Sequence, residues 1–181
     1  MVDPADSGTQ PYDDPGWFPG VAGASGASGT DGLVILRILF LSLLAAPFLI
    51  LLVLTFVIDE VGSLEPLLGT GVAGLAIAGV AAAGWVTRRD LDVTSAETLA
   101  QSYRTSFFLG FALNEAPLLI AFVFCYIEEA MWPYLVAFPI YLVGMWLLAP
   151  TKRNLARRQE QVHRRGSMLS LGQALASSPG A

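Results

Sequence analysis

The chain is too apolar for a soluble globular domain: 54% of its 181 residues are hydrophobic, 14% are charged, and its mean hydropathy is +0.59. The formal net charge of −5 is segregated, because residues 1–31 hold five aspartates and no Lys or Arg, whereas residues 150–181 hold six cationic residues against Glu160. A single cysteine, Cys125, excludes an intramolecular disulfide and any multi-cysteine metal site.

The first segment, residues 1–32, is rich in Gly, Pro, Ala, Ser and Asp and has no hydrophobic period. We expect it to be a disordered acidic tail. It does not have the pattern of a signal peptide, because it lacks a basic start and the apolar stretch that follows is too long.

Residues 33–58 form the first predicted transmembrane helix, since at about 1.5 Å per residue they exceed a hydrocarbon layer of about 30 Å. Pro47 should kink this helix, and Arg37 near its start can extend its charge to the lipid headgroups. Residues 67–86 form the second predicted span, which is dominated by Gly and Ala. Its small residues should let another helix backbone approach closely at Gly71, Gly74, Gly79 and Gly84.

Residues 105–127 and 132–149 form the third and fourth predicted spans, and the loop of about four residues between them requires that they pack side by side. The aromatic residues of the fourth span lie toward its two ends, as interfacial aromatics do: Trp132, Tyr134, Tyr141 and Trp146. Residues 150–181 form a basic, partly helical tail with a helix to about Arg165 and a mobile end. The sequence thus predicts an all-α integral membrane protein, a four-transmembrane-helix bundle over residues 33–149 between two tails.

The cationic residues indicate the orientation of this bundle. Every Lys and Arg falls on one side of the four-span arrangement, which by the positive-inside rule predicts a multi-pass protein of the cell membrane with both termini cytoplasmic. Several of them should contact lipid headgroups: Arg88, Arg89, Arg104, Lys152, Arg153, Arg157 and Arg158.

The third span carries a carboxylate, Glu115, close to the predicted middle of the bilayer. An ionised carboxylate at that depth costs about 2.5–3.5 kcal/mol on insertion scales, so it should be protonated, paired or facing water. No Lys or Arg lies at its depth. The possible partners are neutral: Ser42, Tyr141 and the adjacent Asn114. Two interpretations stay open, a proton-binding group and a neutral, hydrogen-bonded group that tightens the bundle.

The run from Arg104 to Ala116, RTSFFLGFALNEA, resembles the second helix of the c subunit (proteolipid) of F-type ATP synthases. In that family a stretch of the form R/Q-T-x-F-F-x-G-x-A-L-x-E-A carries the ion-binding glutamate, and Glu115 falls on that position. The resemblance covers residues 67–127 and implies a helical hairpin with a glycine-rich first helix, a cytoplasmic loop and a glutamate that takes up and releases a proton. The first and fourth spans have no counterpart in a two-helix subunit, so we do not expect an ordinary rotor subunit.

The sequence does not predict an enzyme or a cofactor. The glycine pattern that begins at Gly69 lies inside a predicted membrane helix with no strand before it, so it does not indicate a dinucleotide site. His163, in the basic tail, has no partners for a metal site or a catalytic triad. The expected partners are the lipid bilayer and other membrane-protein subunits or further copies of the chain, and not nucleic acid. Two functions remain: a proton-binding or proton-transport-associated membrane subunit, and a non-catalytic accessory or scaffold subunit of a membrane complex.

Overall fold

The structure, a computed structural model, describes residues 32–63 and 65–177, so the predicted acidic tail lies outside the described residues apart from Gly32. These residues form helices and no strand. The helices are α1 (Gly32–Val57), α2 (Pro66–Thr87), α3 (Ala96–Ile127), α4 (Trp132–Leu148), α5 (Lys152–Arg164) and α6 (Leu171–Ser177).

Local sequence signals explain the ends of the longest helix, α3. Ser95 and Thr98 form a reciprocal capping box, in which the Ser95 hydroxyl accepts from the Thr98 amide at 3.2 Å and the Thr98 hydroxyl accepts from the Ser95 amide at 3.0 Å. The helix therefore begins at Ala96, nine residues before the predicted span, and ends where Glu128 becomes its C-cap. Over 32 residues it is longer than an apolar layer of about 30 Å requires, so its first turns extend beyond the other long helices.

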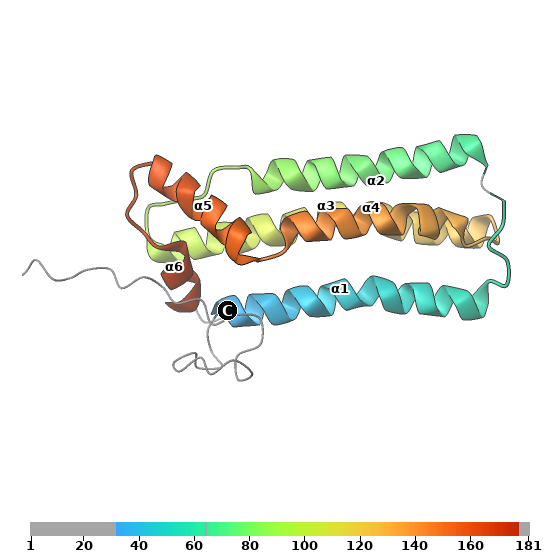
Figure 1. The fold of residues 1–181 in the computed structure, drawn as a ribbon, viewed down its shortest axis with the longest axis horizontal. Coiled ribbons are helices and arrows are strands. Elements are labelled where there is room, and N and C mark those ends of the chain that lie inside the picture. The colour runs from blue at the N-terminus through green and yellow to red at the C-terminus, as the bar shows by residue number, and fades with distance from the viewer. Residues whose placement is uncertain (1–31, 64, 178–181) are drawn as a thin grey trace, which may run out of the picture.

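The four long helices lie along one axis, and α5 and α6 cover one end of them (Figure 1). Helices α2, α3 and α4 pack against one another, and α1 lies on the opposite side of α3 and α4 from α2 (Figure 1). All ten Lys and Arg residues lie at the end that holds α5 and α6, which we call the basic end. The opposite end, the acidic end, carries the carboxylates of the two short loops: Asp59, Glu60, Glu65, Glu128 and Glu129.

Three of the described helices, α1, α2 and α3, are long and apolar enough to cross a membrane. Helix α4 has 17 residues and reaches that length when it is counted together with α5, which follows it after a bend of 54°. Large apolar side chains on the outside of the long helices are exposed, for example Phe56, Leu67 and Trp146. These surfaces indicate a membrane protein, because hydrocarbon and not water is the solvent that tolerates them.

The glycines of α2 differ in their contacts within the described chain. Gly79 does pack closely: a Cβ there would lie 2.6 Å from Pro117 Cγ and 2.8 Å from the Leu113 carbonyl oxygen of α3. At Gly71, Gly74 and Gly84 an added Cβ would meet nothing within 4 Å among the described residues. No helix of the described chain covers these three glycines, so a close helix approach there stays a prediction. A glycine-rich helix has small residues on every face, and composition alone does not show which face is covered.

The basic tail is more ordered than we expect from its composition. Helix α5 is followed by α6, which packs against α1 and α3 through buried Leu171, Ala174 and Leu175. Gln159 holds the connection between the two helices, because its amide donates to the Leu169 carbonyl at 2.8 Å and accepts from the Leu171 amide at 2.6 Å. The prediction of a mobile end is therefore wrong for residues 171–177.

Arg37 is not extended toward headgroups as we expected. Its side chain is 0% exposed, and its Nε donates to the carbonyl of Pro150 at 3.2 Å, just past the end of α4. A helix end leaves carbonyl oxygens without intrahelical donors, and a cationic donor there is favourable. Arg37 thus joins the start of α1 to the bend between α4 and α5.

Candidate functional site

Glu115 lies on α3, 12 residues before Ile127, which places it about 18 Å from the acidic end of that helix. Its neighbours in sequence face other helices: Asn114 lies against α4, and Pro117 lies against Gly79 of α2. Successive residues of an α-helix are rotated by about 100°, so the Glu115 side chain does not point directly at either the Asn114 contact with α4 or the Pro117 contact with α2. Its side chain is half-buried.

Asn114 is fixed in the interface between α3 and α4. It is 2% exposed, and its Nδ2 donates to the backbone carbonyl of Tyr141 at 3.1 Å. The space for it comes from Gly144, where a Cβ would overlap Asn114 Oδ1 and lie 2.5 Å from Cγ. Sequence reasoning missed Gly144, although a small residue one turn after Tyr141 was a usable signal.

Two tyrosines of α4 lie near Glu115. The side chains of Tyr134 and Tyr141 are 0% and 2% exposed, and both hydroxyls lie within the range over which a charge on the Glu115 carboxyl would act. Tyr134 donates its hydroxyl hydrogen to the Pro47 carbonyl of α1 at 2.8 Å, whereas the Tyr141 hydroxyl has no hydrogen-bond partner among the described residues. Both side chains are buried, since α4 is surrounded by α1, α2 and α3. Tyr134 lies in the first turn of α4, toward a helix end as predicted, whereas Tyr141 lies near its middle.

The three predicted partners of Glu115 have different positions. Tyr141 is close to it, and Asn114 is adjacent but engaged with α4. Ser42 is exposed on α1 and donates to the Ile38 carbonyl of its own helix at 3.0 Å, so this prediction is wrong. Ser42 was predicted because it lies at a depth similar to that of Glu115, but its side chain lies on the outward face of α1. Tyr134 was not predicted as a neighbour.

The electrostatic surroundings of Glu115 lack a counter-charge. Within residues 32–63 and 65–177, no hydrogen bond or ion pair reaches its carboxylate, and the ion pairs of Arg164 with Glu160 and of Arg165 with Asp90 lie at the basic end. In apolar surroundings without a cation the neutral carboxylic acid is the favoured form. The same part of the chain has no group of three or more His, Cys, Asp or Glu residues arranged to hold a metal ion.

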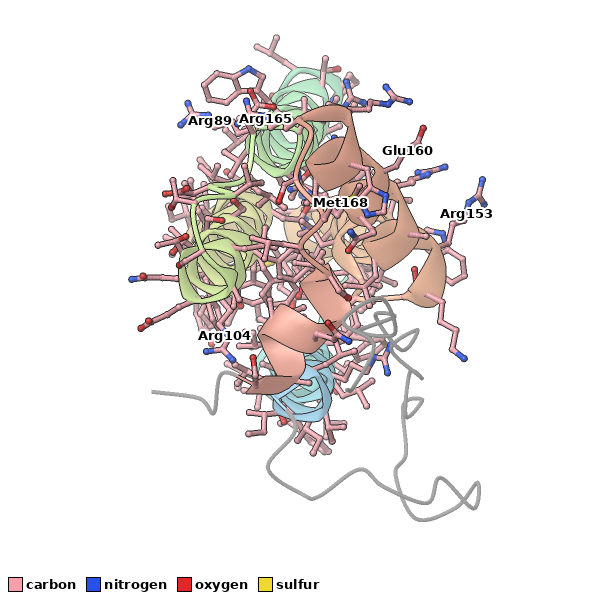
Figure 2. All side chains as sticks on the ribbon, turned by 90° about the vertical axis from the view of Figure 1, so that its left-hand side faces the viewer. Arg89, Arg104, Arg153, Glu160, Arg165 and Met168 are labelled. Atoms are coloured by element: carbon pink, nitrogen blue, oxygen red, sulfur yellow. The ribbon has the colours of Figure 1, made fainter. Side chains whose placement is uncertain are left out.

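The arginines predicted to meet headgroups divide into exposed and packed residues. Figure 2 looks onto the basic end, where Arg89 and Arg165 lie near α2 and Arg153 points away from the bundle. Arg89 stacks on the ring of Trp85, with 3.9 Å between its Cζ and the ring centroid. Arg158 is packed, because it is 9% exposed and its Nη1 donates to the Arg89 carbonyl at 3.1 Å.

The described residues define an all-helical protein with three or four helices of membrane length, and among these residues the Glu115 carboxylate has no hydrogen-bond or ion-pair partner. Comparison with known protein families, with curated proteins and with solved structures finds no match.

Proposed function

We propose that the chain is a four-span membrane protein in which Glu115 binds and releases a proton, as a subunit of a proton-transport-associated membrane assembly. In this proposal α1 to α4 each cross the bilayer, and the basic end is cytoplasmic because it carries every Lys and Arg of the chain. The single observation that carries the proposal is the half-buried Glu115 carboxylate, which has no salt bridge and no hydrogen bond among the described residues.

The arrangement of α2 and α3 is compatible with the resemblance to the c-subunit hairpin. The two helices pack on each other and are joined at the basic end, as that family's polar loop would require. Helix α4 packs against both of them, and a rotor carboxylate must be presented to a stator on an open face. We therefore propose a proton-binding subunit and not the rotor subunit itself.

The test is the reactivity of Glu115 with a hydrophobic carbodiimide, which modifies protonated carboxyl groups in apolar surroundings. The full-length protein in liposomes should be labelled at Glu115, and labelling should fall as the pH rises and the carboxyl ionises. Glu128→Gln is a matched control because Glu128 is exposed at the acidic end. The variant Glu115→Gln should lose the adduct and any proton uptake while its thermal unfolding is unchanged. Absence of labelling at every pH would contradict the proposal.

A second candidate function is an accessory subunit that binds another membrane helix. The observation that favours it is the exposed surface of α2 at Gly71 and Gly74, where nothing lies within 4 Å of an added Cβ. Surfaces of this kind let two membrane helices approach closely. Under this alternative Glu115→Gln leaves function intact, whereas Gly74→Leu disrupts the assembly.

A further inference from the structure

A cavity of about 430 Å³ opens at the basic end between α2, α3, α4 and α5. Its polar lining comes from three separate segments of the chain and includes Arg88, Tyr103, Asn154, Arg157, Arg158 and Gln161. Asn154 is fixed there because its Nδ2 donates to the carbonyls of Leu147 and Ala149 at 3.1 and 2.8 Å. The bend between α4 and α5 thus places α5 next to the bundle, where α5 forms one side of the cavity.

The charge in this cavity is of one sign. Arg88, Arg157 and Arg158 contribute three guanidinium groups, and no carboxylate is among its lining residues. Arg158 is held in place by Nη1 bonds to the Arg89 carbonyl at 3.1 Å and to Gln161 Oε1 at 2.9 Å. Its burial lowers the pKa of the guanidinium, yet the ordinary pKa of arginine is so high that the charge remains. A fixed cation flanked by two exposed cations is suited to an anion with several oxygen atoms.

The position of the cavity along the bundle indicates the kind of anion. Trp85 and Trp146, which are 61% and 81% exposed, lie at the basic ends of α2 and α4, where aromatic residues mark the membrane interface. Leu147 and Leu148 line the cavity next to the arginines, and Leu147 is itself exposed on the outside of α4. Cationic and apolar walls therefore meet at the depth where a phosphate group and the first part of an acyl chain lie in a bilayer.

We propose that this cavity is a binding site for the phosphate group of an anionic phospholipid, with the lipid chains along Leu147 and the adjoining surface of α4. Arg158 provides the fixed contact to a phosphate oxygen, and Arg88 and Arg157 close over the phosphate from α2 and α5. Basic pockets between membrane helices at the cytoplasmic side bind phospholipid headgroups in this way. The site is independent of Glu115 and of its protonation.

The test is native mass spectrometry of the full-length protein in detergent with added dioleoyl phosphatidylglycerol or dioleoyl phosphatidylcholine. We expect one phosphatidylglycerol to bind more tightly than phosphatidylcholine. Arg157→Gln and Arg88→Gln should each weaken that binding about fivefold, the loss that corresponds to about 1 kcal/mol per interfacial cation. Both residues are exposed, so the variants should unfold at the temperature of the unchanged protein.

Arg153→Gln is the matched control, because Arg153 lies on the same helix and is exposed but does not line the cavity. Its effect should stay below twofold. An equal loss in Arg153→Gln and Arg157→Gln would overturn the proposal in favour of diffuse attraction to the basic end. Inorganic phosphate should displace the lipid poorly; displacement at equal concentration would show a site for free anions and would also overturn it.

Discussion

Gly79 provides a direct test of how the bundle is packed. A Cβ at this position would lie 2.6 and 3.2 Å from Pro117 Cγ and Cδ and 2.8 Å from the Leu113 carbonyl oxygen. Neither the proline ring nor a backbone carbonyl can turn aside as a flexible side chain would. Gly79→Ala should therefore push α2 and α3 apart, and we expect it to destabilise the protein.

The magnitude follows from a comparison within the same helix. Replacing glycine by alanine in a helix interior stabilises the helix by about 0.5–1 kcal/mol, and this gain applies equally at Gly74, where an added Cβ meets nothing within 4 Å. Overpacking a well-packed contact costs about 1–3 kcal/mol. The helix contribution cancels when the two variants are compared, so Gly79→Ala should be about 1–3 kcal/mol less stable than Gly74→Ala.

The assay is thermal unfolding of both variants in the same mild detergent at the same protein concentration. A difference of about 2 kcal/mol corresponds to roughly 4–8 °C for a chain of this size. Equal unfolding temperatures would refute the packing of α2 on α3 described above. A large destabilisation by Gly74→Ala would show that its exposed surface is covered by another chain.

Two further predictions concern the contact between Asn114 and Gly144 and the loop between α2 and α3. Gly144→Ala should displace the Asn114 side chain and lower the free energy of unfolding by about 1–3 kcal/mol in the same assay. Combining it with Asn114→Ala should restore part of that loss, because the smaller side chain leaves room for the added methyl group. If the double variant is no more stable than Gly144→Ala, the strain does not arise at Asn114. The side-chain hydroxyl and the amide of Thr94 donate to Asp92 Oδ1 at 2.7 and 3.0 Å, and these bonds lower the pKa of the Asp92 carboxyl. The stability that the ionised carboxylate contributes is therefore present above the ordinary pKa of aspartate. It is lost as the pH falls through the lowered pKa of the folded protein. Asp92→Asn should thus be less stable than the unchanged protein at neutral pH and equal to it in strong acid, and a difference that persists in acid would contradict this account.

Hydropathy was sufficient to predict where the long helices lie, because the cost of exposing a backbone to hydrocarbon leaves few alternatives to a helix. The predicted span 33–58 corresponds to α1 at Gly32–Val57, and the predicted span 67–86 corresponds to α2 at Pro66–Thr87. The extension of α3 to Ala96 lies in a polar stretch that hydropathy does not mark, but the cap-like residues Thr94 and Ser95 predict a helix start there, and Ser95 is the N-cap. Helix α6 depends on contacts with α1 and α3 that no local pattern shows.

The sequence predicted how deep each candidate side chain lies in the bundle, but not which way the side chain points. Glu115 and Tyr141 do lie near each other, because residues at equal depth on adjacent helices can meet. Ser42 has a similar depth and faces outward. The sequence did not predict the burial of Arg37 and Arg158 for a related reason. Both side chains donate to backbone carbonyls of distant residues, Pro150 and Arg89, and these carbonyls come within reach when the tail packs against the bundle.

Asn114 and Glu115 are consecutive polar residues in an apolar helix, and the contrast between them bears on the choice between the two interpretations of the carboxylate. Asn114 is held in place in this bundle: it is buried, its Nδ2 donates across to α4 and a glycine opposite accommodates it, although its Oδ1 has no hydrogen-bond partner among the described residues. Glu115 has none of these features within the part of the chain that the structure describes, although the unpartnered Tyr141 hydroxyl lies within its electrostatic reach. Leaving Glu115 unengaged keeps its carboxyl free to gain and lose a proton, which is what the proposed function requires and a purely structural role does not.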